Sequence, residues 1–149
     1  MTAFEDALEA LAALDVAGVA HSFGMEALPG PVDPALLPAL TIQLADPRDR
    51  LFPQSSGGFD VLPFEGGPAR YSVSVRHHLL VAVAGMAANP QPKLAQLIDA
   101  YFAALEADPM LGGALALPAR VQVEIGEIRQ GIGRFVGAVF RHVWALEVE

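Results

Sequence analysis

Cysteine is absent from the 149 residues, so neither a disulfide-stapled scaffold nor a cysteine-ligated zinc site is possible. Lysine occurs once, at Lys93, and 9 basic residues face 17 acidic ones for a net charge of −8. A chain this acidic repels phosphate unless its cations gather in one place, and the sequence shows no such gathering. With 53% hydrophobic residues the chain is also too apolar to stay disordered. These absences favour a single folded domain over a tail, a small metal module or a basic nucleic-acid binder.

The chain also lacks the features of an exported or membrane-spanning protein. Its first four charged residues, Glu5, Asp6, Glu9 and Asp15, are all acidic, whereas a secretory signal begins with cations. The longest apolar run covers the 10 residues 79–88, and a helix needs about 20 to cross a bilayer. We therefore expect the protein to remain in the compartment where it is made, with no membrane partner.

Hydropathy points to self-association. The mean hydropathy is +0.40 and only 17% of the residues are charged, so the polar side chains are too few to cover the surface of a monomer. Apolar surface that remains exposed usually marks a contact with a partner, here a second copy of the chain. The alternative is that alanine, which adds little hydrophobic area, accounts for most of the excess.

Periodicity predicts two helices and four strands, with a further short β-prone piece at 19–23. Thr2 and Glu5 fit a capping box at the start of the first helix, and Asn89 and Pro90 fit the N-cap and first residue of the second. The elements follow in the order helix 3–14, strand 40–44, irregular segment 47–68, strand 71–83, helix 90–107, strand 120–129 and strand 135–148, with a hairpin turn at 130–133. This order predicts an α+β fold in one domain, residues 1–149, with a mixed or mostly antiparallel sheet, two helices packed on one face and a long irregular loop.

Two of these elements carry the clearest patterns. Strand 71–83 alternates, with one set of side chains predicted to face the core and the other to face away. Helix 90–107 has an apolar stripe at helical spacing that is expected to pack on the sheet. The core-facing strand residues are Tyr71, Val73, Val75, His77, Leu79, Val81 and Val83, and the helix stripe is Leu94, Leu97, Ile98, Tyr101, Phe102 and Leu105.

Segment 47–68 contains eight glycines and prolines, which prevent a helix or a continuous central strand. Long loops of this kind in a compact domain are typically functional or disordered. This one also carries more large apolar side chains than is comfortable in water, so we interpret it as an arm that binds a partner subunit. The alternative is a loop that folds back over its own core. The candidate interface residues are Leu51, Phe52, Phe59, Val61, Leu62 and Phe64.

The histidines invite a metal or catalytic hypothesis that the pattern does not favour. His77 and His78 are successive strand residues and face opposite sides of a sheet, so they cannot both bind one ion. His77 falls on the apolar face, where we expect a bond to backbone or a partner side chain, and His78 on the polar face. His142, two residues before Trp144, could become a neighbour of His77 across the sheet. No carboxylate accompanies the two, so the sequence predicts no catalytic dyad.

Other motifs are also weak. Gly131, Gly133 and Gly137 only faintly resemble a phosphate-binding loop, because β-prone residues follow them where a dinucleotide fingerprint needs a helix. Glu124 and Glu127 are most simply solvated. We therefore predict no catalytic, metal or cofactor site, and no enzyme activity.

The order of elements and several local phrases resemble the tail terminator and neck proteins of long-tailed bacteriophages, small α+β domains that form hexameric rings. The resemblance extends over most of the chain, although segment 47–68 is where members of that family differ most. The phrases that carry it are the opening helix and residues 15–19, 37–40, 70–80, 97–105, 111–113 and 146–149.

This resemblance implies a structural virion protein, assembled in the cytoplasm of a bacterial host. Such a protein forms a ring at the head-proximal end of the tail, ends polymerisation of the tail tube and joins the tail to the head. Its partners would be further copies of itself, the tail-tube protein and a head-connector protein, while DNA would pass through the lumen without specific binding. Absence of a catalytic site and of cofactors is expected in this class.

Alternatives remain open at this point. The nearest is a head-closure or other minor tail protein of the same general design. A different class is a small ligand-binding or catalytic α+β domain, in which Tyr71, His77 and His142 would line a pocket. A third is a partner-dependent regulatory module, which would be a monomer or dimer rather than a ring.

Overall fold

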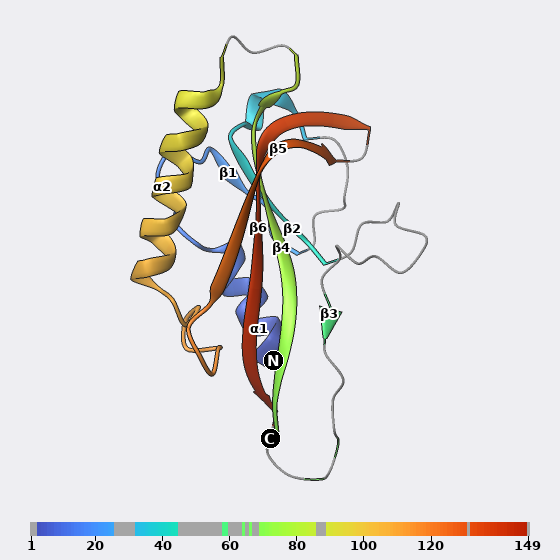
Figure 1. Ribbon diagram of the computed structural model, residues 1–149, viewed down its shortest axis with the longest axis vertical. Helices are drawn as coiled ribbons and strands as arrows, with labels where there is room; N and C mark the ends of the chain where they lie inside the picture. The colour runs from blue at the N-terminus through green and yellow to red at the C-terminus, as the bar shows by residue number, and fades with distance from the viewer. Residues whose placement is uncertain are drawn as a thin grey trace.

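A computed structural model describes residues 3–25, 32–44, 58–59, 64, 66, 69–85, 89–130 and 132–148. Two helices and six strands make up the regular structure of this part of the chain, together with one short 3-10 helix. The elements are α1 (Ala3–Ala12), β1 (His21–Ser22), η1 (Pro34–Leu36), β2 (Ala39–Gln43), β3 (Gly58–Phe59), β4 (Ala69–Val83), α2 (Gln91–Ala107), β5 (Arg120–Gln130) and β6 (Gly133–Val148) (Figure 1).

The strands form one open mixed sheet in the order β1-β2-β4-β6-β5, and β3 pairs with β4 off this path. Only the β1–β2 pair is parallel. Because β6 occupies one side of β4 along its length, β2 and β3 share the other side, β2 at residues 76–80 and β3 at residues 73–74. The sheet therefore has β1 at one edge and the 11-residue strand β5 at the other.

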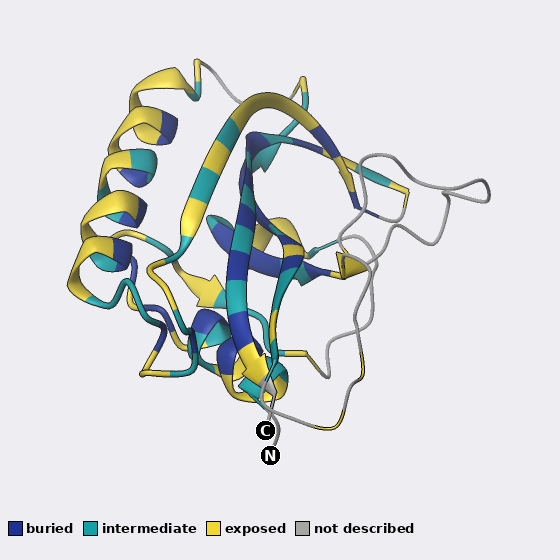
Figure 2. Cartoon of the chain, turned by 60° about the horizontal axis from the view of Figure 1, so that its bottom comes forward, coloured by how far each residue is buried: buried dark blue, intermediate teal, exposed yellow. Residues whose placement is uncertain are grey.

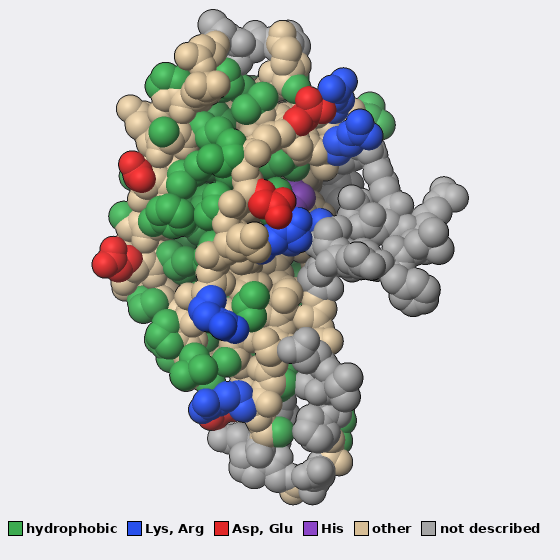
Figure 3. Space-filling model, in the orientation of Figure 1, with side chains coloured by type: hydrophobic (Ala, Val, Ile, Leu, Met, Phe, Trp, Pro, Cys, Tyr) green, Lys and Arg blue, Asp and Glu red, His purple; other side chains and the backbone are tan. Residues whose placement is uncertain are grey.

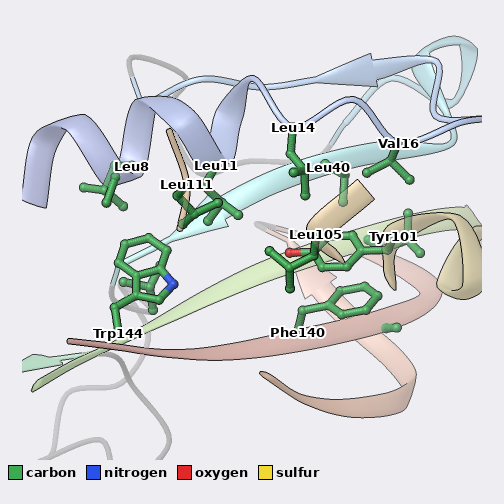
Figure 4. Packing of buried hydrophobic residues seen from close by; sticks show 14 of the residues in the cluster. Leu8, Leu11, Leu14, Val16, Leu40, Tyr101, Leu105, Leu111, Phe140 and Trp144 are labelled. Atoms are coloured by element: carbon green, nitrogen blue, oxygen red, sulfur yellow. The ribbon is translucent and has the colours of Figure 1, made fainter. Parts of the chain in front are cut away.

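Both helices cover the same face of the sheet, which we call the helix face (Figure 1). Figure 4 shows Leu8 and Leu11 of α1 above Trp144 of β6, and Tyr101 of α2 beside Phe140. The Tyr101 and Phe140 rings stack with centroids 3.6 Å apart and an interplanar angle of 12°. Alternation along β4 and β6 supplies the sheet side of this core, since every second side chain points toward the helices. The fold class predicted from the sequence, including helices on one face, is confirmed.

A second, smaller cluster of Leu80, Ile128 and Phe135 lies on the opposite face of the sheet. Leu80, Ile128 and Phe135 point to this face by regular alternation along β4, β5 and β6. The pairing of β4 with β6 shifts register between Leu80 and Ala82, which is a β-bulge. Up to Val81 the predicted alternation holds, but after the bulge Val83 packs with the second cluster instead of the first. The prediction that Val83 shares the face of Tyr71 was therefore wrong, because an inserted residue reverses the side of each residue after it.

Gly137 explains how two strands can approach so closely at this bulge. A Cβ atom built on Gly137 would lie 1.8 Å from the carbonyl oxygen of Leu79. No side chain fits there, and the glycine that faintly resembled part of a phosphate loop instead permits a backbone contact. The expected hairpin at 130–133 is confirmed, since Gln130 pairs with Gly133 across it.

Small corrections concern element ends and the polar face. Helix α2 begins at Gln91 with Pro90 as N-cap, one residue later than predicted, and the side-chain oxygen of Asn89 accepts from the Gln91 N–H at 3.2 Å. Residues 40–44 alternate apolar and polar, which predicts a half-buried strand with Thr41 and Gln43 on its polar face, yet each of these two residues is only 6% exposed. His78 does lie on the face opposite His77, but it too is buried.

Candidate functional site

A chain of hydrogen bonds links four fully buried side chains on the helix face of the sheet. The Tyr101 hydroxyl of α2 lies 2.7 Å from Nδ1 of His77 on β4 and 2.6 Å from Nε2 of His142 on β6. The indole Nε1 of Trp144 lies 3.1 Å from Nδ1 of His142. We call these four residues the histidine cluster. It joins one helix to the two central strands through polar contacts inside an apolar core.

The indole of Trp144, at one end of this series of hydrogen bonds, fixes which atom donates and which accepts in every bond of the series. An indole N–H can only donate, so Nδ1 of His142 accepts and its Nε2 carries the hydrogen. That N–H donates to the Tyr101 oxygen, and the Tyr101 O–H in turn donates to Nδ1 of His77. Both imidazoles are then neutral, with hydrogen on Nε2. Nε2 of His77 ends the chain with no partner among the described residues.

Burial keeps these groups uncharged. Desolvation lowers the pKa of His142 from 6.5 to about 4. The pKa of His77 is lowered well below its usual value, first by desolvation and then by the charges of His142 and His78. Desolvation likewise raises the pKa of the Tyr101 hydroxyl well above 10.0. At neutral pH the four side chains of the cluster are therefore uncharged and are joined by hydrogen bonds alone.

This arrangement is suited to positioning rather than to chemistry on a substrate. None of the four side chains exceeds 0% exposure, so no ligand reaches them in this conformation. No carboxylate takes part in the hydrogen bonds, and the described residues contain no group of three or more potential metal ligands. The network holds Tyr101, and with it α2, against β4 and β6.

The pocket alternative placed Tyr71, His77 and His142 together, and the structure does not bring Tyr71 to the others. Its ring instead lies 5.3 Å from that of Phe59. The sequence did suggest that the two histidines become neighbours, and their ring centroids are 6.3 Å apart. The link between them, Tyr101, was predicted only as part of the apolar stripe. The sequence does contain one signal for this link, a tyrosine among the leucines of a buried stripe. A buried tyrosine hydroxyl needs a hydrogen-bond partner in the core.

A hollow of about 390 Å³ lies elsewhere, between the end of α1 and the segment after β1. Its lining includes Glu9, Ser22 and Met25, and no histidine. Ser22 Oγ donates to the Ala12 carbonyl at 2.7 Å, which satisfies one of the free carbonyls at the end of α1. The hollow is wide open to solvent and holds no group of unusual reactivity.

Of the six predicted interface residues, the structure describes Phe59 and Phe64; Leu51, Phe52, Val61 and Leu62 lie outside the described residues. Phe59 belongs to β3 and is 45% exposed, with its ring 4.9 Å from that of Phe4. This side chain folds partly against its own subunit. Phe64 is 82% exposed.

Further large apolar side chains are exposed along β5 and beside it. Ile125 in the middle of the strand is 67% exposed, and Ile132 in the hairpin turn is 89% exposed. Figure 2 shows β5 as mostly exposed next to the buried β6, and Figure 3 shows hydrophobic side chains gathered over α2 and the neighbouring part of the sheet. Phe102 of α2, predicted to be core, is 44% exposed, because it lies at the border of the helix stripe.

Two ion pairs link β5 to β6. Arg134 Nε lies 2.6 Å from Glu127 and Arg141 Nε lies 3.1 Å from Glu124, each guanidinium meeting both oxygens of its carboxylate. The hydrogen bond to Arg134 lowers the pKa of Glu127. Both glutamates were expected to be simply solvated; they are exposed, but each is held by an arginine.

Comparison with known proteins adds no identity to this description. No protein-family model matches the chain, and no curated protein matches it. Within the described ranges no helix is long and apolar enough to span a membrane.

Proposed function

We propose that this protein is a structural subunit of a phage tail, a tail terminator whose copies form a ring at the head-proximal end of the tail tube. The observation that supports this most is the apolar surface that one copy leaves uncovered. Phe64 and Ile125 are each more than half exposed although the chain has a well-filled core. Exposed apolar side chains on an open sheet are typical of a subunit that completes its fold by contact with others.

A closed ring needs two different patches that meet head to tail. In our proposal one patch contains Phe59 and Phe64, and the other is an exposed edge of the sheet. The two patches lie on different parts of the subunit, because β3 pairs with β4 while the edges are β1 and β5. The ring is hexameric in the family that the sequence resembles, and the tail-tube and head-connector proteins would bind its two ends.

The charge of the chain fits a lumen through which DNA passes without binding. The net charge is −8, and three of the arginines lie within 3.1 Å of a glutamate oxygen. Paired guanidinium groups are weak phosphate ligands because their charge is already balanced. The buried histidine cluster fits the same role, since it stiffens the subunit and presents no reactive group.

Electron microscopy of the purified protein, alone and mixed with tail-tube protein, tests the proposal. We expect rings that bind tube ends and stop tube growth. Rings that bind only to heads or head connectors would favour a head-closure protein instead. A protein that stays monomeric or dimeric with tubes present, and leaves tube length unchanged, would refute the ring proposal.

A variant pair tests the patch. The double substitution Phe59→Ser and Phe64→Ser should convert rings to smaller species on a sizing column with light scattering. Phe64→Ser alone is the cleaner variant, because Phe59 also contacts Phe4 and Tyr71 within its own subunit. Ile132→Ser, at an equally exposed position outside the patch, serves as the control and should leave ring mass unchanged.

A further inference from the structure

The free edge of β5 has the composition of a strand that pairs with another strand. Its 11 residues hydrogen-bond to β6 on one side only, so the backbone groups on the other side have no strand partner within the described chain. A long edge with an exposed isoleucine is a template for pairing, and proteins normally shorten, charge or cover such edges. The first half of β5 carries no such protection on its helix face, where Val121, Val123 and Ile125 follow one another.

We propose that β5 pairs antiparallel with β5 of a second copy around a two-fold axis, giving a continuous sheet across the dimer. An antiparallel pair around such an axis can keep both helix faces on one side only when the two residue numbers of each pair sum to an even number. Few registers remain, and they differ in which side chains of the two copies lie opposite each other.

Centring the axis on Val123 gives the best match. Val121 then lies opposite Ile125 of the other copy, and Val123 lies opposite its own equivalent, so the helix face of the contact is apolar throughout. On the opposite face Gln122 meets Glu124 and can donate to its carboxylate, while Arg120 lies diagonal to that glutamate. Unlike charges meet and no like charges face each other. The contact also covers Ile125, which one copy leaves 67% exposed.

Other centres are worse. With the axis on Glu124 the two Glu124 carboxylates face each other. With the axis on Ile125 or Gly126, Val123 lies opposite Glu127 or Arg129 and apolar side chains are paired with charges. With the axis on Gln122, Ile125 reaches past the strand to Ala119, outside the bounds of β5. The complementarity of charge and hydropathy therefore selects one register and one occupant, a second copy of the same strand.

This contact does not rest on the proposed ring. A two-fold contact joins identical patches and closes after two copies, whereas a ring joins different patches. The pairing leaves β1 as the exposed sheet edge and leaves Phe59 and Phe64 uncovered, so the two contacts use separate surfaces. Phe64→Ser should weaken the ring and leave the β5 contact intact, so the two proposals can fail separately.

The mass of the protein in solution gives the first test. Sedimentation of the protein before assembly should show a species of twice the 15.7 kDa chain mass. Ile125→Lys places a charge against Val121 of the other copy and should weaken this dimer about a hundredfold or more. It should not disturb the fold of the monomer, because Ile125 is exposed there. Ile132→Lys is the matched control, because Ile132 is also exposed but lies outside the paired segment. A wild-type monomer at all concentrations, or a dimer that Ile125→Lys leaves intact, would overturn the proposal.

Cross-linking tests the register directly, since the natural chain has no cysteine. Val123→Cys places two thiols opposite each other at the axis, with Cα atoms about 5 Å apart, and should form a disulfide dimer under mild oxidation. Ile125→Cys, on the same face, places its thiols four residues out of register, about 14 Å apart, and should remain reduced. Cross-linking of Ile125→Cys in preference to Val123→Cys would overturn the register.

Discussion

Trp144 donates its indole N–H to Nδ1 of His142, two residues earlier on the same face of β6, at 3.1 Å. This single contact orders every proton in the cluster, because the indole cannot accept and the imidazole must therefore carry its hydrogen on Nε2. The direction then passes through the Tyr101 hydroxyl to His77.

We expect imidazole nitrogen NMR spectra at pH 7 to show His77 and His142, the two histidines of the cluster, as the Nε2–H tautomer. In Trp144→Phe the Nδ1 atom of His142 loses its donor, so the preference for that tautomer should weaken at His142. His21 is exposed and belongs to no part of the cluster, so its signals provide an internal reference. Finding hydrogen on Nδ1 of His142 in the natural protein would contradict the assigned direction.

Tyr101→Phe tests what the bridge contributes to stability. The substitution keeps the ring that stacks on Phe140 but leaves two buried imidazole nitrogens without a partner. Each unsatisfied buried group costs about 1–3 kcal/mol, so for two groups we expect a loss of about 2–6 kcal/mol in the free energy of unfolding, measured with urea. Tyr71→Phe is the matched control, since Tyr71 is only half-buried, and it should change stability by less than about 0.5 kcal/mol. Equal losses of unfolding free energy in the two variants would show that the Tyr101 bridge does not contribute to stability beyond an ordinary tyrosine hydroxyl.

The sequence predicted the parts of this fold that depend on local periodicity. The alternation in β4 and the stripe of α2 each repeat several times, so single exceptions do not obscure them. The bulge after Leu80 was not predictable, because it depends on the close approach of Gly137 on a strand more than 50 residues away in the chain.

The histidine cluster shows the same limit. The sequence placed His77 and His142 on the apolar face, and strand pairing brings them near each other. What joins them is a hydroxyl from α2, and the position of a helix over a sheet is set by packing rather than by a sequence pattern. The burial of Thr41, Gln43 and His78 was missed for a related reason, since a polar strand face reads as solvated until its surroundings are known.

Stability should fall as the pH drops below about 6.5. The folded-state pKa of His142 is about 4, and that of His77 is also well below the usual 6.5 of an unfolded chain. Between these values the unfolded chain binds protons that the folded protein does not, so the free energy of unfolding decreases by about 1.4 kcal/mol per pH unit for each histidine. This contribution is fully present above pH 6.5 and is lost as the pH falls toward 4.

Urea unfolding at pH 7.5, 6.5, 5.8 and 5.2 measures this slope in a range where few carboxylates titrate. His142→Gln removes one of the two groups, and although it lowers the stability at every pH, its slope should be about half that of the natural protein. A slope near zero in the natural protein between pH 6.5 and 5.2 would show that the histidines are protonated in the folded state.

Gly137 and Gly126 provide the sharpest pair of substitutions, because they face each other across β6 and β5 in the same register. A Cβ on Gly137 would lie 1.8 Å from the Leu79 carbonyl oxygen, which belongs to the backbone and cannot turn away, while a Cβ on Gly126 meets nothing within 4 Å. Gly137→Ala must therefore push β4 and β6 apart at the bulge and disturb the second cluster of Leu80, Ile128 and Phe135. We expect a loss of about 3 kcal/mol or more in unfolding free energy, or a failure to accumulate as folded protein. Gly126→Ala should be neutral or stabilise by up to about 1 kcal/mol, because it only reduces the freedom of the unfolded chain. Similar urea midpoints for the two variants would mean that the close contact at Gly137 can relax, and that the bulge does not depend on glycine.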